Sequence, residues 1–476
     1  MRRFSVAIIC ILLVFSLISC TTSESEIVPE YDASVSEDSL DLNGQQLKMG
    51  MAIMSYYESD NSTLTYINDT DLGDLAAQRL KDVEEKYNCE IIFDYVARSG
   101  ELAFNSAIAG TYVYDFINEE SYFLENFMRA NAFVDLTTLE NIDVFDETKW
   151  GNRNIRIQSM YNGAIYAVLP AAHPSRVQNS MGGMIVVNED IIASLITTDP
   201  RDYFENGTWN WETFTNCLNT YAHTSGLSNE YVYSFSCNGY GGIARGLAMS
   251  NGVDYVTLND SGNVKEIGYV SQLAIDAYNQ AYDWLYGSTA DNVLSTGGEA
   301  SLVSGFISGN SAMMLTNVWR LLANSDSIAY RLDNYGLVPV PVGPNASGPD
   351  DYKITTSSAL FSTCIPITAK DAEISAFIID KIYAPFEGYE TKEDMIDYLT
   401  KNYFHDRRDS VFFIEMIEDD HVWFHPSRHS NFQDQIPNTG VASGVEANEE
   451  VLFKEMENDI FPMYKTMLQY EELFHK

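Results

Sequence analysis

The sequence predicts an α/β protein with two domains, in which helices flank mainly parallel sheets. The length of 476 residues is too great for one hydrophobic core. Buried-strand patterns alternate with helical patterns along the chain, and strand–helix–strand units favour parallel sheets with right-handed crossovers. Hydrophobic residues make up 45% of the chain and aromatic residues 13%, which is ample for buried cores.

The first 19 residues predict a secretory signal peptide. Two arginines precede an apolar run over 4–18, which is shorter than the roughly 20 residues of a membrane-spanning helix. The run ends in Leu17-Ile18-Ser19-Cys20, which resembles the bacterial lipobox. The resemblance implies that Cys20 carries a diacylglycerol thioether and becomes the mature N-terminus. The alternative is ordinary signal cleavage with Cys20 present by chance.

Residues 20–45 predict the lipidated cysteine followed by a disordered acidic tether. The stretch 21–45 holds seven acidic residues, many Ser and Thr, and no Lys or Arg. The formal net charge is -40, and removing residues 1–19 takes away two arginines and no acid, which leaves -42. Such a negative field repels phosphate backbones and anionic lipid. We therefore expect no nucleic-acid partner and a covalent attachment to the membrane.

The first domain is predicted to begin with alternating strands and helices. We expect strands over 47–54, 89–96 and 114–118, and helices over 71–88, 100–109 and 121–133, the first of them capped by Asp69 or Thr70. In parallel sheets, ligands bind at the carboxyl ends of the strands. The loops 55–61, 96–100 and 118–122 are therefore the first candidates for a binding site.

The rest of the chain predicts a second strand–helix domain and a helical C-terminal region. We expect a strand over 184–190, a hairpin over 256–264, an extended segment over 335–351, and strand–helix units within 304–323 and 358–383. Further helices are expected over 206–223, 274–287 and near 451–474. Trp209 and Trp211 open the first of these helices, where packing is the better interpretation.

The cysteines do not predict a metal site. Cys89, Cys217, Cys237 and Cys364 remain once the signal peptide and Cys20 are set aside, and they show no CxxC or Cys/His spacing. A Cys217–Cys237 disulfide is permitted in an exported protein. We expect no metal, nucleotide or other cofactor.

Five segments in a fixed order resemble one family. They are NGAIYAVLP before a strand ending in VVNED, NGTWNWETF at a helix start, GNSAMMLTNVW, YGLVPVPVGP and CIPITAKDAEISAFIIDKIY. Their order over most of 47–390 is similar to that in bacterial extracellular solute-binding proteins of carbohydrate-uptake ABC transporters, the class that includes maltose-binding protein. The resemblance thins after about residue 390.

The resemblance implies a two-lobed periplasmic-binding-protein-like fold of type II. Lobe 1 would hold 46–168 and 357–400, and lobe 2 would hold 174–352 and 404–476. The crossings fall near Pro170 and Ser357, where a few dihedral angles can absorb a closure motion. The resemblance further implies a monomeric receptor at the outer face of the cytoplasmic membrane. It would catch a mono- or oligosaccharide between the lobes and deliver it to ABC permease subunits.

Candidate ligand-binding residues come from the resemblance and from the predicted loops. Trp319 stands where the family often stacks an aromatic ring on a sugar, and the alternative is a core tryptophan. Arg320 beside it can donate a fork of hydrogen bonds. The other candidates are polar or aromatic residues of loops, each with packing or solvation as its alternative: Tyr56, Glu58, Asp60, Asp115, Glu119, Glu120, His173 and Tyr240.

The sequence shows none of the catalytic motifs searched for. No GxSxG elbow, HExxH, Walker loop or GxGxxG after a strand is present. The composition does not exclude a glycoside hydrolase, because that chemistry needs only two suitably spaced acidic residues and the chain has many. The order of motifs, however, resembles that of binding proteins, and we expect no enzyme. Two alternatives stay open: a surface glycan-binding lipoprotein without a transporter, and a binding protein for a peptide or another non-sugar solute.

Overall fold

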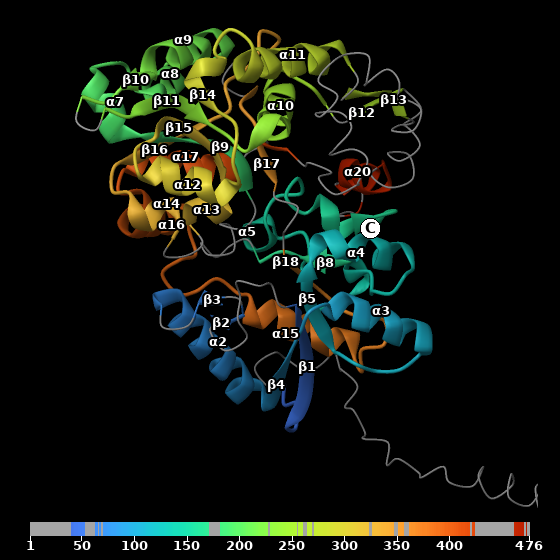
Figure 1. Cartoon of the computed structure of the whole chain (residues 1–476). Helices are drawn as coiled ribbons and strands as arrows, with labels where there is room; N and C mark the ends of the chain where they lie inside the picture. The colour runs from blue at the N-terminus through green and yellow to red at the C-terminus, as the bar shows by residue number, and fades with distance from the viewer. Residues whose placement is uncertain are drawn as a thin grey trace, which may run out of the picture.

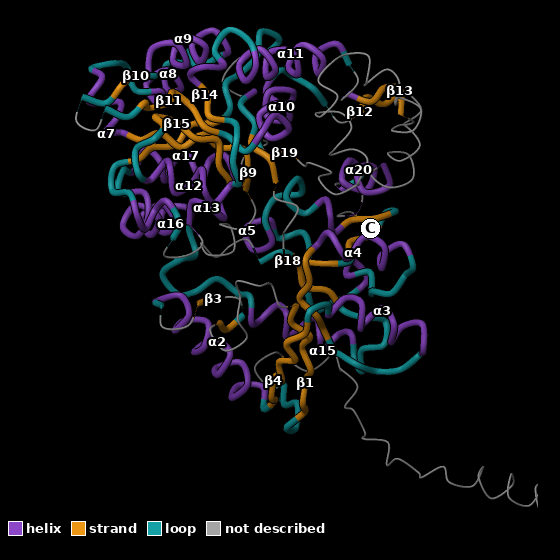
Figure 2. Tube along the Cα trace, viewed as in Figure 1, coloured by secondary structure: helices purple, strands orange, loops and turns teal. Residues whose placement is uncertain are grey.

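The computed structural model contains two α/β parts, each built around its own sheet (Figure 1). It describes residues 40–52, 62–64, 66–67, 70–170, 181–226, 229–254, 256–259, 264–268, 271–322, 326–346, 351–356, 361–418, 421–423, 461–470 and 473. Figure 2 shows the strands gathered in two separate groups, with helices around each.

The first sheet has the strand order β4-β1-β5-β18-β8. Its strands are β1 (Gln45–Ala52), β4 (Cys89–Val96), β5 (Phe116–Glu120), β18 (Phe361–Cys364) and β8 (Ala167–Val168). β1 pairs in parallel with β4 and β5, whereas β18 is antiparallel to β5 and β8. The surrounding elements are β2 (Ser62–Thr63), β3 (Tyr66–Ile67), β6 (Met160–Tyr161), β7 (Ala164–Ile165), α2 (Asp71–Tyr87), α3 (Ser99–Ala109), α4 (Ser121–Arg129), α5 (Glu147–Trp150) and α15 (Ala372–Ile382).

The second sheet is built around β9 (Met181–Asn188), which pairs antiparallel with β15 (Ser311–Asn317), β16 (Tyr335–Pro339) and β17 (Ile354–Thr356). Its other strands are β10 (His223–Thr224), β11 (Tyr231–Ser236), β14 (Val293–Leu294) and β19 (Val422–Trp423), and β12 (Val256–Leu258) and β13 (Val264–Ile267) form a separate hairpin. Its helices are α7 (Glu189–Leu195), α8 (Pro200–Glu205), α9 (Trp211–Tyr221), α10 (Gly239–Ser250), α11 (Gln272–Tyr286), α12 (Glu299–Ile307), α13 (Val318–Leu322), α14 (Ile328–Arg331), α16 (Lys392–Leu399) and α17 (Arg407–Glu418). α20 (Phe461–Leu468) lies near the end of the chain.

Both sheets are mixed, although parallel βα units form the centre of the first. The direction of each crossing strand explains this. β1, β4 and β5 run toward one edge of the first sheet, whereas β18 enters the sheet at that same edge and must run back. β9 likewise enters the second sheet at an edge where β15 and β17 end. Strands that carry the chain between the sheets therefore add the antiparallel pairs.

The predicted elements of the first part are recovered with small shifts. Thr70 caps α2, because its hydroxyl accepts a hydrogen bond from the N–H of Gly73 at 3.1 Å. The strand predicted over 114–118 lies two residues later, at Phe116–Glu120. α4 ends at Arg129, earlier than predicted, and Asn131 turns the chain with a positive φ of 53°.

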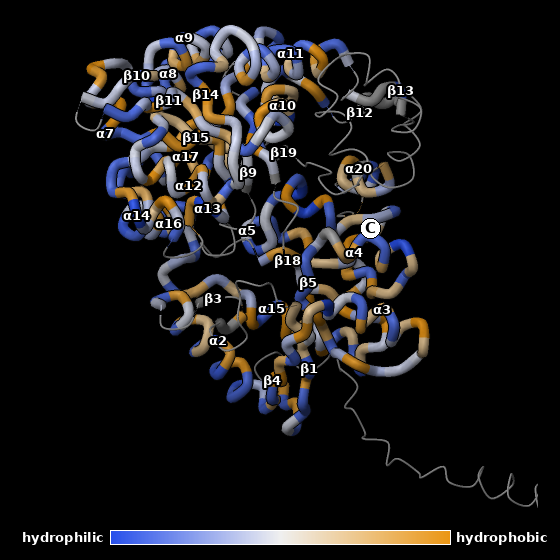
Figure 3. The backbone as a smooth tube through the Cα atoms, in the orientation of Figure 1, coloured by the Kyte–Doolittle hydropathy of each residue, from blue (hydrophilic) through white to orange (hydrophobic). Residues whose placement is uncertain are grey.

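Each sheet has its own hydrophobic core. In the first core, Leu47, Met49 and Met51 of β1 pack against α2 and α15, while Ala103 of α3 and Leu124 of α4 cover the other face of the sheet. In the second core, β9 and β15 are buried among the helices of that part. Figure 3 shows hydrophobic colours along β11, β14 and β15, in the middle of the second part.

At two places, residues pack in the core of the other part than the expected lobe boundaries imply. Residues up to 400 were expected in lobe 1, but Met395, Ile396 and Leu399 of α16 lie in the second core. The C-terminal residues were expected in lobe 2, but Tyr470 and Leu473 lie in the first core. Amphipathic helices pack on whichever sheet lies near them, and their sequence pattern does not specify which one.

Trp209 packs in the second core as expected, and its indole N–H donates to the carbonyl of Pro339 at 2.8 Å. Cys217 and Cys237 are both buried free thiols, so the permitted disulfide does not form. Within the described part of the chain, no helix is both long and apolar enough to cross a membrane.

Candidate functional site

Two sheet edges lie near each other where the chain crosses between the sheets. The first edge contains the ends of β1, β4 and β5 and the start of β18, and the second contains the ends of β15 and β17 and the start of β9. The crossing from β17 to β18 leaves only four residues between Thr356 and Phe361. Five extended steps reach at most about 18 Å. Side chains just beyond these strand ends therefore lie around the region between the two sheets.

Glu119 is positioned by the backbone around the first edge. It is fully buried, and its carboxylate accepts the N–H of Gly100 at 2.9 Å and the N–H of Glu120 at 3.0 Å. Ser99 adds a hydroxyl donor at 3.3 Å. Burial raises the pKa of Glu119, whereas these hydrogen bonds and the nearby charge of Arg98 lower it. The carboxylate sits at the N-terminus of α3, where the helix dipole favours a negative charge, so its contacts are structural.

Asp115 lies at the opposite end of the first sheet, so the structure does not bring it to the edge where it was expected. The strand begins at Phe116, one residue after Asp115, which therefore precedes the strand rather than following it. Its carboxylate is buried and accepts the N–H of Lys48 and the hydroxyl of Tyr112, both at 2.7 Å. These bonds fix the loop before β5 to the middle of β1.

Glu120 does lie at the first edge, opposite Phe361 in the pairing of β5 with β18. Its side chain is buried. The next residue, Ser121, shares a hydrogen bond of 2.7 Å with the hydroxyl of Ser362. Glu120 is thus at the predicted place, in a polar and largely buried setting.

Tyr240 packs inside the second part. It lies in the first turn of α10, and its hydroxyl donates to the carbonyl of Tyr278 in α11 at 2.9 Å. Burial raises the pKa of Tyr240. With its ring in the second core and its hydroxyl bonded, Tyr240 serves to join two helices.

Trp319 and Arg320 follow the end of β15 at the second edge and line a pocket of about 370 Å³. Arg320 forms an ion pair with Glu299 at 3.0 Å, and its N–H donates to Asn317 at 3.0 Å. Asn317 in turn donates to Glu299 at 2.7 Å. Three polar residues thus fix the turn that carries the half-buried Trp319. The other lining residues come from α12, α14 and the segment before α14: Ala300, Val303, Ser304, Ile307, Ser308, Asp326, Ser327 and Arg331.

The remaining predicted residues fall outside the described part of the chain. These are the candidate ligand contacts Tyr56, Glu58, Asp60 and His173, and the predicted lipid attachment site Cys20.

Arg98 and Phe123 were not singled out from the sequence, yet both lie at the first edge. Arg98 follows β4, inside the flagged loop 96–100, and Phe123 lies in the first turn of α4. The guanidinium carbon of Arg98 is 3.5 Å from the centre of the Phe123 ring. Their positions in the sequence could have indicated them, because both residues follow soon after strands that end at this edge.

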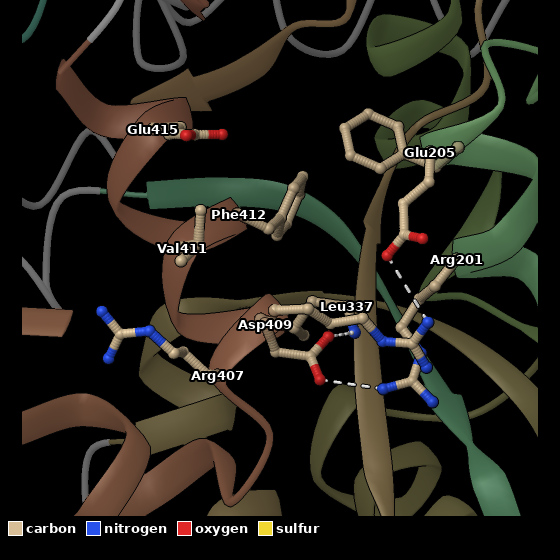
Figure 4. Close-up of a pocket in the computed structure, with 10 residues that line it drawn as sticks. Arg201, Glu205, Leu337, Arg407, Asp409, Val411, Phe412 and Glu415 are labelled. Atoms are coloured by element: carbon tan, nitrogen blue, oxygen red, sulfur yellow. Dashed lines mark hydrogen bonds and ion pairs between the residues drawn. The ribbon is translucent and has the colours of Figure 1, made fainter. Parts of the chain in front are cut away.

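A second pocket, of about 380 Å³, lies between α8, β16 and α17 (Figure 4). Its floor is an ionic cluster in which buried Arg201 contacts Glu189, Asp199 and Asp409 at 2.5, 2.6 and 2.9 Å. Asp409 also accepts the N–H of Leu337 at 2.7 Å. Because these charged groups are bonded to one another, the cluster ties α17 to β16 and α8. It is a structural element of the second part.

Among the residues that the structure describes, no group of three or more His, Cys, Asp or Glu side chains is arranged to hold a metal ion. Buried Cys364 is similarly unsuited to chemistry, because burial raises the pKa of its thiol well above the ordinary value.

No family model matches this sequence, and no curated protein matches it. Solved structures do match, over most of the chain. A cyclo/maltodextrin-binding protein complexed with maltotetraose is 15% identical with a TM-score of 0.55, covering 90% of this chain and 97% of that one. An ABC transporter associated binding protein from B. animalis subsp. lactis Bl-04, in complex with β-1,6-galactobiose, is 14% identical with a TM-score of 0.54, covering 87% and 98%. An ABC substrate-binding protein from Listeria monocytogenes, in complex with cycloalternan, is 13% identical with a TM-score of 0.53, covering 87% and 99%. The chain therefore has the two-lobed α/β fold of these proteins, as the sequence predicted.

Proposed function

We propose that this chain is the extracellular substrate-binding protein of an ABC importer, and that it captures a mono- or oligosaccharide between its two lobes. The observation that carries the proposal is the shared fold, which extends over about 90% of the chain and nearly all of the sugar-binding proteins it matches. The order of motifs in the sequence supports the same function independently of the fold. No catalytic step is proposed.

The Trp319 pocket supports a saccharide as the ligand. A half-buried indole is held by the Glu299–Asn317–Arg320 hydrogen bonds at the second edge, and serine hydroxyls and charged groups line the same pocket. Sugars present alternating apolar C–H faces and hydroxyl edges, which suit an aromatic ring flanked by polar groups. Binding that involves both lobes would shift the population toward a closed state.

The exported location and the lipid anchor belong to the same proposal. The signal peptide over 1–19 and Cys20 would place the receptor at the outer face of the cytoplasmic membrane, with 20–45 as the tether. Closed, liganded receptor would then dock on the two permease subunits. The receptor would act as a monomer and would need no cofactor.

Isothermal calorimetry against a panel of mono- and oligosaccharides tests the function. We expect one saccharide class to bind, and Trp319→Ala to weaken that binding about tenfold because a stacking face is lost. Tyr231→Ala is the matched control, since this exposed tyrosine at the start of β11 lies at the opposite end of the second sheet from Trp319. Binding of sugar that is unchanged by Trp319→Ala would remove Trp319 from the site. Failure of the whole panel, with heat from peptides instead, would refute the saccharide assignment.

The alternative of a glycan-binding protein without closure makes a different prediction in solution scattering. A transport receptor should become more compact when the saccharide binds, whereas a rigid surface binder should not. Release of product from chromogenic glycosides would contradict the absence of catalysis.

A further inference from the structure

Arg98 is held in a fixed position at the first edge. The loop that carries it is bonded to the end of β5, because the N–H of Gly100 donates to Glu119 at 2.9 Å and the hydroxyl of Ser99 donates to the carbonyl of Asn118 at 3.0 Å. Its guanidinium lies over the Phe123 ring at 3.5 Å. The hydrogen-bonded loop and the Phe123 ring of α4 together thus determine the position of the Arg98 guanidinium.

The guanidinium of Arg98 forms no hydrogen bond or ion pair with any residue the structure describes, although its charge is near enough to lower the pKa of buried Glu119. This is unusual in a chain with 68 acidic and 28 basic residues. Arg129 and Arg407, which are also at least partly exposed, pair with Glu125 and with Glu393 and Asp397 respectively. The carboxylate of Glu119, the nearest acid of the loop, is directed at backbone N–H groups instead.

The charge of Arg98 lowers the pKa of buried Glu119, but this Coulomb attraction does not require a guanidinium at this position. Arg98 is the N-cap residue of α3 and makes no capping hydrogen bond. A positive charge at the N-terminus of a helix opposes the helix dipole. The stacking on Phe123 leaves the arginine exposed, where a cation–π contact contributes little.

The stacked arrangement suits recognition of a carboxylate. The ring holds the guanidinium flat, which leaves its in-plane N–H donors directed outward, and a guanidinium fork matches a carboxylate in a bidentate pair. Resting on the proposed function, we infer that Arg98 and Phe123 form the lobe 1 half of the ligand site and that the captured saccharide carries a carboxylate, as in a uronic acid. The acidic surface of the protein would otherwise repel such a ligand, so the site needs a local cation whose N–H donors are not used by a protein carboxylate.

Matched pairs of saccharides that differ only at C6 test the inference. Galacturonate is compared with galactose, glucuronate with glucose, and α-1,4-digalacturonate with α-1,4-galactobiose, each by calorimetry with the full mature domain. We expect at least one acidic member to bind more tightly than its neutral partner. Arg98→Met should weaken acidic binding by about 10- to 100-fold, the size of a charge-assisted pair, and neutral binding by less than about threefold.

Two further variants separate the charge from the geometry. Arg98→Lys keeps the charge but lacks the planar fork, so we expect an intermediate loss for the acidic saccharide. Arg407→Met removes another exposed arginine, which belongs to the pocket between α8 and α17, and it should change neither affinity. The acidic affinity should also fall as salt rises, since the pair is partly exposed.

The outcomes distinguish this inference from the proposed function. Binding of neutral saccharides with no binding of their acidic partners would overturn the inference and leave the function intact. An equal loss for both members of a pair in Arg98→Met would also overturn it, because the arginine would then contact hydroxyls alone. Absence of binding by every saccharide, acidic or neutral, would overturn both.

Discussion

Replacing Arg201 with methionine removes the centre of the ionic cluster in the second part. The Arg201 and Asp409 side chains are only 4% and 1% exposed, and their polar atoms are 2.9 Å apart. At an effective dielectric constant of about 20, a pair of charges at this distance attracts by about 6 kcal/mol before desolvation is subtracted. Removing one partner leaves the other charges buried without compensation. We therefore expect Arg201→Met to lower the free energy of unfolding by about 3–5 kcal/mol at pH 7.

The pH dependence of this loss follows from Asp409. Burial raises its pKa to about 7, although Arg201 lowers it, so the folded protein binds a proton here that the unfolded chain has already released above about pH 4. The contribution of Asp409 to stability is thus present below pH 4 and is lost as the pH rises toward 7. Without Arg201, the pKa of Asp409 should rise further. The difference between wild type and variant should then be constant below about pH 6 and should grow above pH 7, by up to about 1.4 kcal/mol per pH unit.

Urea unfolding at pH 6, 7 and 8.5, followed by tryptophan fluorescence, measures both quantities. Arg407→Met is the control, because its side chain is 46% exposed and borders the same pocket, and its solvent-exposed ion pairs with Glu393 and Asp397 should contribute little to stability. A loss in Arg201→Met no greater than in Arg407→Met, or a difference from wild type that does not depend on pH, would refute this account of the cluster.

Two further predictions concern the C-terminal end of helix α7 and the predicted lipid attachment site. Ile196 caps the C-terminus of α7 with a left-handed φ of 52°, and its side chain is 95% exposed. Glycine adopts this backbone conformation without strain, so Ile196→Gly should stabilise the protein by about 1 kcal/mol in thermal unfolding. Ser194→Gly, inside the helix, is the control and should destabilise the protein. Cys20→Ser should abolish lipid attachment, so that the protein is found in the soluble fraction or retains its signal peptide; unchanged membrane association with a cleaved signal would contradict lipidation of Cys20.

Local patterns were sufficient to predict most of the helices and strands. α2 shows why, since its apolar spacing, its Thr70 cap and its acidic first turn all favour the same 17-residue helix. The register of a short strand is less well determined. β5 starts two residues later than predicted, because apolar and polar residues do not alternate strictly in YDFINEE, and Asp115 therefore lies before the strand rather than within it.

For the candidate site, the sequence could predict which loops lie around it but not which side chains meet there. The loop 96–100 was flagged because it follows a strand, but the stacking of Arg98 on Phe123 depends on how α4 is placed, which no local pattern contains. The same holds for the ionic cluster, which brings Glu189, Asp199 and Arg201 together with Asp409 from more than 200 residues away. Trp319 could be proposed from the sequence because its position rests on an ordered set of motifs rather than on contacts, and its role in binding stays a prediction.

The C-terminal segment contacts both cores, and this bears on how the two sheets can move. Met463 of α20 lies in the second core, whereas Tyr470 lies in the first core and accepts a hydrogen bond from the guanidinium of buried Arg156. The hydroxyl of Thr466 accepts the N–H of Gly163 at 2.8 Å. A rotation of one sheet relative to the other must therefore change the packing of α20 as well. If saccharide binding selects a closed state, the open and closed states differ in this packing in addition to their ligand contacts. The affinity of the receptor would then depend on residues of the C-terminal segment that never touch the ligand.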